Sequence, residues 1–209
     1  EGRSGRLGRH LLALVAEGQG GRMYLPADSE QITIADVERP DDYPDADLPN
    51  NPRDFKTPNY GMMTFAELFT NRQLVALTTF SELIGEVRTQ IEADGGSAEY
   101  AQSVSVYLAF VVDKMTDYHS SVCSWHSSGE KIRNTFGRQA IPMVWDYAEA
   151  NPFCASSGSY DNMLGWVVKS IGALPASSSG VAVQLDAQSD DGLRDIMIST
   201  DPPYYDNIS

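Results

Sequence analysis

The feature that most constrains the fold is a long segment in which apolar residues recur at helical spacing. It begins at Thr64, which forms a capping-box pattern with Glu67, and it ends at Gly95, where a glycine pair is typical of a helix terminus. A second segment of this kind begins near Ser97 and could extend as far as Gly129. Such helices need a shared core for their apolar faces, so a mainly helical body is predicted. The apolar positions are Leu68, Leu74, Leu77, Phe80, Leu83, Ile84, Val87 and Ile91 in the first segment, and Val104, Leu108, Val111, Val112 and Met115 in the second.

Shorter elements are expected on both sides of this helical body. The stretches 11–16 and 22–25 flank a Gly-Gln-Gly-Gly sequence, which is typical of a hairpin turn and lacks the Lys-Ser/Thr ending of a phosphate-binding loop. Residues 38–60 are rich in proline and acid, so a loop is predicted there. A short element is predicted at 143–149, and a further helix at about 160–171.

Two β-type segments follow a run of serines after Pro175. The segments 181–185 and 196–199 are short and apolar, and each is followed by an acid, Asp186 or Asp201. Ligands bind at the carboxyl ends of strands in α/β sheets, so the predicted fold class is α/β with a site at this edge. The predicted division is 1–60 for the hairpin and the acidic connector, 61–175 for a helical insertion, and 176–209 for the start of the sheet.

Charge and cysteine content restrict the functions that this chain can have. Its net charge of −14 argues against nonspecific DNA binding by this chain alone, so any nucleic-acid surface is expected to be local or to lie outside these 209 residues. Arginines do gather near the start, at positions 3, 6, 9 and 22. The sequence has no apolar run long enough to span a membrane and no evident signal peptide. Its two isolated cysteines form no disulfide framework, so a cytoplasmic protein is expected.

The sequence Asp201-Pro202-Pro203-Tyr204 carries the clearest chemistry. The exocyclic amine of a nucleobase is a poor nucleophile because its lone pair is delocalised into the ring, and it needs acceptors that draw its hydrogens out of the ring plane. Asp201 offers a carboxylate, and Pro202 offers a backbone carbonyl held by two stiff prolines. Tyr204 can stack on a base that has left the duplex. The alternatives are a turn acid at Asp201 and a core aromatic at Tyr204.

A second interpretation of the same residues is a protein ligand. Pro202-Pro203-Tyr204-Tyr205 fits the PPxY pattern that WW-type domains bind as a polyproline helix. Such ligands usually lie in polar, disordered segments, whereas 193–199 is predicted to be a short buried strand, which favours the methyl-transfer interpretation. Asp186 is a candidate acceptor for the adenine amino group of a cofactor, and a solvated turn acid is its alternative.

The histidines and cysteines of the helical body are predicted to be packing or exposed polar residues rather than metal ligands. His119, Cys123 and His126 would share one helix face, with Cys154 as a fourth residue, but they lack the paired CxxC or HExxH spacing of zinc sites. No metal site is therefore predicted. The aromatic residues within 136–166 are predicted to be core rather than a base-stacking platform.

Three stretches of the chain resemble a known family. Residues 198–208, which contain the Asp-Pro-Pro-Tyr sequence, resemble motif IV of the amino-directed DNA methyltransferases, and more narrowly the large bacterial adenine-specific DNA methylases that contain a zinc ribbon. Residues 68–74 and 136–153 support the same subgroup. The resemblance implies a Rossmann-like fold, S-adenosylmethionine as cofactor and DNA as partner. It also implies that Asp201 and Pro202 hold the target amine, that Tyr204 stacks on the flipped base, and that Asp186 lies near the cofactor's adenine.

Parts of the family pattern are missing from this sequence. The Phe-x-Gly-x-Gly type cofactor loop and the cysteine-paired zinc ribbon are absent from these 209 residues. The chain also begins with Glu1 and ends soon after its motif, so an internal fragment, inactive by itself, is expected. Residues 61–175 would be an insertion that recognises the target, and restriction or host defence is the setting that the family implies. A noncatalytic helical module that binds protein or DNA, with a vestigial motif, is the remaining alternative.

Overall fold

The chain divides into two units, one ending at Ala173 and the other beginning at Leu174. The architecture comes from a computed structural model that describes residues 2–175, 180–186, 188, 194–195 and 197–201. Within that described part, the regular elements are helices and two antiparallel sheets of two strands each. Among the same residues, no helix is both long and apolar enough to cross a membrane.

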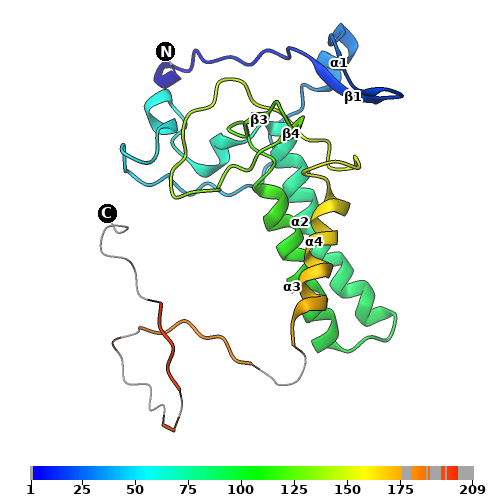
Figure 1. The fold of residues 1–209 in the computed structure, drawn as a ribbon, viewed down its shortest axis with the longest axis vertical. Coiled ribbons are helices and arrows are strands. Elements are labelled where there is room, and N and C mark those ends of the chain that lie inside the picture. Colours follow the sequence, from blue (N-terminus) through cyan, green and yellow to red (C-terminus); the bar gives the residue numbers. More distant parts are fainter. Residues whose placement is uncertain (1, 176–179, 187, 189–193, 196, 202–209) are drawn as a thin grey trace. The chain divides into compact units, whose positions relative to one another are not determined.

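Three long helices form the body of the first unit, and α3 packs against both of the others (Figure 1). They are α2 (Asn71–Ala93), α3 (Ala98–Thr116) and α4 (Tyr160–Ala173). The Ser97 side chain caps α3 by accepting a hydrogen bond from the Tyr100 N–H at 3.2 Å. Gly95, whose φ of +91° favours glycine, lies in the connection between α2 and α3, as the sequence predicts. The predicted helix at 160–171 is likewise confirmed by α4.

The first predicted helix proves to be two elements. Thr64 and Glu67 do form a capping box, but it begins only the short 3₁₀ helix η3 (Phe65–Leu68). The backbone is then extended at Phe69 and Thr70, and a second capping box starts α2: the Gln73 N–H donates to the Thr70 hydroxyl at 3.1 Å, and the Thr70 N–H donates to the Gln73 side chain at 2.8 Å. The second cap therefore interrupts the helix, although the spacing of apolar residues continues across both elements.

The second predicted helix ends earlier than expected, at Thr116 rather than near Gly129. The Asp117 carbonyl, just past this end, accepts hydrogen bonds from the Thr135 N–H at 2.7 Å and from its hydroxyl at 2.9 Å. The Asp117 side chain accepts the Phe136 N–H at 2.7 Å. A loop distant in sequence therefore supplies the donors at this helix end, which the local pattern could not reveal.

The N-terminal hairpin is confirmed, with β1 (Leu14–Gly18) paired antiparallel to β2 (Gly21–Leu25). The connector at 38–60 is largely irregular, as predicted, apart from isolated bridges and the 3₁₀ helix η2 (Thr57–Tyr60). The predicted element at 143–149 is wrong, because this segment is a loop that makes one bridge to Ser124. The remaining elements, which the sequence did not reveal, are η1 (Gly2–Ser4), α1 (Ser29–Ile34), β3 (Trp125–His126) and β4 (Lys131–Ile132).

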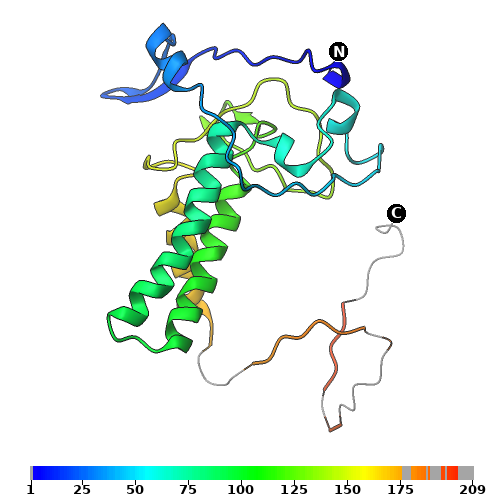
Figure 2. The same ribbon diagram turned by 180° about the vertical axis from the view of Figure 1, so that it is seen from behind.

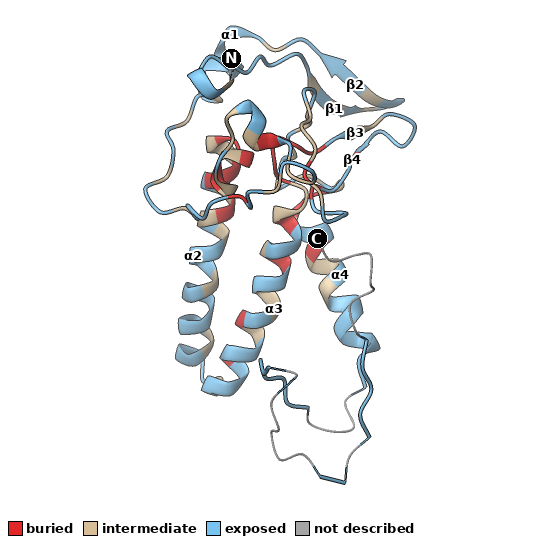
Figure 3. Cartoon of the chain, turned by 90° about the vertical axis from the view of Figure 1, so that its left-hand side faces the viewer, coloured by how far each residue is buried: buried red, intermediate tan, exposed pale blue. Residues whose placement is uncertain are grey.

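The hydrophobic core lies at one end of the helices, where the segment before α2 and the segment between α3 and α4 cover them. Figures 2 and 3 show α2, α3 and α4 side by side, and the buried positions in Figure 3 gather toward the N-terminal end of α2 and the C-terminal end of α3. The far ends of α2 and α3 are more exposed, with Leu83, Val87 and Val106 open to solvent. The core residues are Leu48, Ala66, Leu68, Phe69, Leu74, Leu77, Val111, Met115, Val122, Ile141 and Met163.

The two predicted strands of the second unit are not present in its described residues. Residues 180–186 and 197–201 have no strand pairing, and Val181, Met197 and Ile198 are 91%, 95% and 73% exposed. A β-type segment becomes a strand only when a neighbour accepts and donates its backbone hydrogen bonds. The described residues of this unit supply no such neighbour, so the predicted Rossmann-like sheet is not seen.

Candidate functional site

A network of charged and polar side chains lies where the first turn of α2 meets the loop that ends at Glu149. The Arg72 guanidinium makes a bidentate contact with the Glu149 carboxylate, with Nε–Oε1 and Nη2–Oε2 distances of 2.7 and 2.9 Å. The Thr70 hydroxyl donates to Glu149 Oε1 at 3.2 Å. The carboxylate thus sits beside the positive end of α2, where a negative charge is favourable.

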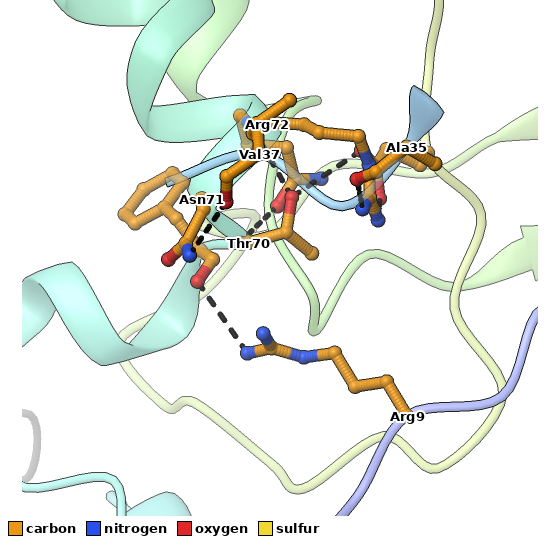
Figure 4. A network of polar contacts seen from close by, with 9 residues as sticks. Arg9, Ala35, Val37, Thr70, Asn71 and Arg72 are labelled. Atoms are coloured by element: carbon orange, nitrogen blue, oxygen red, sulfur yellow. Dashed lines mark hydrogen bonds and ion pairs between the residues drawn. The ribbon is translucent and has the colours of Figure 1, made fainter. Parts of the chain in front are cut away.

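The same turn also holds the N-terminal arm of the chain (Figure 4). Arg72 donates to the Ala35 carbonyl, and the Asn71 side chain donates to the Val37 carbonyl at 3.0 Å. Arg9 approaches the Phe69 carbonyl at 3.5 Å. Three segments far apart in sequence therefore converge on the start of one helix.

Each charged group in this network already has partners. Hydrogen bonding to Glu149 raises the pKa of Arg72. Burial raises the pKa of Tyr147, and the positive charge of Arg9 offsets part of that increase. Arg72 donates to a carboxylate and a carbonyl at once, which leaves it poorly placed to bind a substrate as well. We therefore interpret the network as a structural organiser of this end of the unit.

His119, Cys123 and His126 do not share a helix face, because α3 ends before them. The His119 ring bonds the Gly158 carbonyl at 2.6 Å through Nε2, while the Cys123 sulfur lies 3.0 Å from the Thr135 hydroxyl. His126 belongs to β3. Among the described residues, no group of three or more His, Cys, Asp or Glu side chains is arranged to hold a metal ion.

The buried His119 makes the stability of this unit depend on pH. Burial lowers the pKa of His119 below its ordinary value of 6.5, so the folded state keeps the ring neutral where the unfolded state binds a proton. Stability is therefore full above the unfolded pKa and falls as the pH decreases through it toward the folded pKa. We expect a lower free energy of unfolding, measured in urea, at about pH 5.5 than at about pH 7.5.

His119→Gln is the variant that isolates this effect. It has no titrating group, so the difference between the two pH values should shrink, even though the variant itself is less stable at both. An unchanged difference would assign the pH dependence to other groups.

The prediction that the aromatic residues of 136–166 are core is wrong for several of them. Trp145 is 60% exposed, and Phe153 and Trp166 are also open to solvent. Tyr160 is half-buried and stacks on Phe80, with ring centroids 4.9 Å apart. Burial raises the pKa of Tyr160. The exposed aromatic side chains are thus available for contact with another molecule.

Only part of the predicted catalytic motif can be placed. Asp201 is exposed, whereas Pro202, Pro203 and Tyr204 lie outside the described residues. The Asp186 carboxylate accepts the Gln188 N–H at 2.9 Å, which is the geometry of a local turn. This contact is the one expected of a turn acid, which the sequence left open as the alternative to a cofactor contact.

Models of known protein families, curated proteins and solved structures contain no match to this chain. The resemblance to the adenine-specific methylases accordingly rests on the three stretches of sequence alone. Two of these, 68–74 and 136–153, meet in the structure through the contacts of Thr70 and Arg72 with Glu149. Sequence reasoning singled out both stretches but did not foresee that they touch, because nothing in a single sequence pairs residues 77 positions apart.

Proposed function

We propose that this chain carries the catalytic motif of an S-adenosylmethionine-dependent DNA methyltransferase that acts on the exocyclic amino group of adenine. The observation that carries the proposal is the order Asp201-Pro202-Pro203-Tyr204, in which the first residue is exposed. Asp201 and the Pro202 carbonyl would hold the two hydrogens of the amine, and Tyr204 would stack on the extruded base. The meeting of 68–74 with 136–153 supports the proposal, since both stretches contribute to the same resemblance.

The described residues do not by themselves form a site for S-adenosylmethionine. Asp186 closes a local turn, and the glycine-rich turn that follows β1 joins it to β2 in a hairpin instead of opening a helix. The proposal therefore places cofactor binding in residues other than those described, and it assigns to this chain the recognition of the amine. The setting implied by the resemblance is restriction or host defence.

One observation favours the WW-ligand alternative. The segment before the motif was predicted to be a buried strand, but Met197 and Ile198 are strongly exposed and unpaired in any strand. A WW-type domain needs an accessible, extended ligand, and an unpaired segment next to the motif meets that need. This alternative is consequently the one that an experiment must exclude.

The two functions use different tyrosines of the same sequence. The methyl-transfer motif ends at Tyr204, whereas the PPxY pattern ends at Tyr205. In the full-length protein, we expect Tyr204→Ala to lower DNA methylation by about 5- to 150-fold, because one base-stacking contact of roughly 1–3 kcal/mol is lost. Tyr205→Ala should leave methylation within about twofold of wild type. Transfer of a radioactive methyl group to DNA measures both.

Binding to a purified WW domain provides the reciprocal measurement. If the chain is a WW ligand, Tyr205→Ala abolishes binding and Tyr204→Ala does not. That pattern, together with undetectable methylation by the wild type, would refute the proposed function. The proposed function would be supported if Tyr204→Ala loses methylation, Tyr205→Ala keeps it, and no variant binds the WW domain.

A further inference from the structure

Trp145 is an exposed aromatic residue that the backbone on both sides holds in place. Ile141 is buried. Its N–H donates to the Asp54 carbonyl at 3.0 Å, and its carbonyl accepts the Lys56 N–H at 3.0 Å. On the other side, Tyr147 forms a bridge with Ser124. The few residues between these two anchors present the indole to solvent with 60% of its surface exposed.

The Trp145 ring rests against Tyr60. The two rings meet edge to face, with centroids 5.1 Å apart and an interplanar angle of 82°. Tyr60 ends η2, and Gly61 follows in the left-handed conformation with φ of +99°. An edge-to-face partner steadies the indole and leaves an aromatic face open to a third ring.

Three cations lie on the segments that build this pair. η1 packs directly against η2, so close that a Cβ added at Gly61 would come within 2.6 Å of the Gly2 carbonyl oxygen and 3.0 Å of the Arg3 backbone nitrogen. The Arg3 backbone therefore lies beside the residue that follows Tyr60. Arg53 and Lys56 are exposed on the segment bonded to Ile141, and Lys56 Nζ donates to the Pro52 carbonyl at 2.6 Å. Unlike the Arg72 network, this contact lies at the surface, where solvent weakens it. The acids of the same segments are Asp54, which accepts the Asn51 amide at 2.8 Å and faces Arg53 at 3.5 Å, and Asp146.

We infer that Trp145 and Tyr60, with Arg3, Arg53 and Lys56, form a contact surface for single-stranded DNA. A steadied aromatic face stacks on an unpaired base, and flanking cations bind the phosphates on either side of it. A base inside a duplex cannot offer its ring face, so the partner is single-stranded or locally opened DNA. The inference rests on the proposed function in taking DNA as the partner, but it does not depend on methyl transfer.

This surface reconciles DNA binding with a chain of net charge −14. Cations confined to one local surface attract a polyanion there, while the acidic remainder opposes nonspecific contact elsewhere. Asp146, which follows Trp145 in the chain, is exposed, so its removal should strengthen binding of a polyanion.

The test is the affinity of the full-length protein for a fluorescent single strand of about 12 nucleotides, compared with a duplex of equal length. Trp145→Ala should weaken single-strand binding by about 5- to 150-fold. Trp166→Ala is the matched control: Trp166 is 58% exposed on α4, but Lys169 Nζ lies over its ring at 5.2 Å from the centroid and covers the face that a base would use, so this variant should bind like the wild type. Lys56→Gln should reduce the slope of log affinity against log salt concentration by about 1, the value for one lost phosphate contact. Asp146→Asn should raise the affinity for the single strand.

The outcomes separate this inference from the proposed function. The inference would be overturned if Trp145→Ala binds as tightly as the wild type, or if Trp166→Ala loses as much affinity. It would also be overturned if the wild type binds duplex and single strand equally well. None of these results would bear on the proposed methyl transfer. Binding that depends on Trp145 in a protein without methylation activity would instead support the inference and count against the proposed function.

Discussion

Asp201→Ala in the full-length protein is expected to lower the rate of DNA methylation by about 10²- to 10⁴-fold. The side chain is exposed, so its loss should leave the fold intact. What is lost is a charged acceptor for one hydrogen of the target amine, which must be drawn out of the ring plane before the nitrogen can act as a nucleophile. Single-turnover transfer of a radioactive methyl group measures this step apart from DNA binding.

Asp195→Asn is the matched control for this prediction. Asp195 is an exposed acid of the same unit, and asparagine tolerates its left-handed backbone with φ of +56°. The control removes one negative charge without touching the motif, so its methylation rate should stay near that of the wild type. A wild-type rate in Asp201→Ala, with DNA still bound, would refute the assignment of Asp201.

The largest effect on stability is expected from Leu68→Ala. The Leu68 side chain is fully buried in the core, and its truncation should cost about 2–5 kcal/mol through lost burial and the cavity left behind. The Leu68 carbonyl accepts the Ser121 N–H at 2.7 Å and the Ser121 hydroxyl at 2.8 Å. The substitution leaves these backbone contacts in place, so the loss should reflect the side chain alone. Equilibrium unfolding in urea measures it.

Leu83→Ala makes the same chemical change at an exposed position of α2. It should cost under about 1 kcal/mol, since little apolar surface is removed from the interior. Equal losses in the two variants would mean that the core does not lie at the loop-covered end of the helices.

The helical part of this fold could be predicted because its signals are local. Ser97 caps α3 and Gly95 lies in the turn before it, as a reading of neighbouring residues suggests. The end of α3 could not be predicted, because the donors that bond the Asp117 carbonyl come from Thr135. The C-terminal strands were predicted incorrectly for a related reason. Apolar β-branched residues favour a strand, but a strand forms only when a neighbouring strand supplies its backbone hydrogen bonds.

The candidate sites divide in the same way. The chemistry of Asp201 and its prolines can be proposed from four consecutive letters, since each residue type has a role that does not depend on distant partners. The contact between Arg72 and Glu149 has no such local signal. The exposure of Trp145 was also missed, because an aromatic residue in a loop between apolar positions looks like core until the anchors at Ile141 and Tyr147 are known.

The way in which α2 holds the N-terminal arm has a consequence for how this sequence can vary. Asn71 and Arg72 bind the carbonyls of Val37 and Ala35, not their side chains. Every amino acid supplies a carbonyl, so positions 35 and 37 can change identity over evolution without breaking these contacts. The donors at 71 and 72 have no such freedom. Among relatives of this chain, variation should therefore be tolerated on the arm and purged at the first turn of the helix.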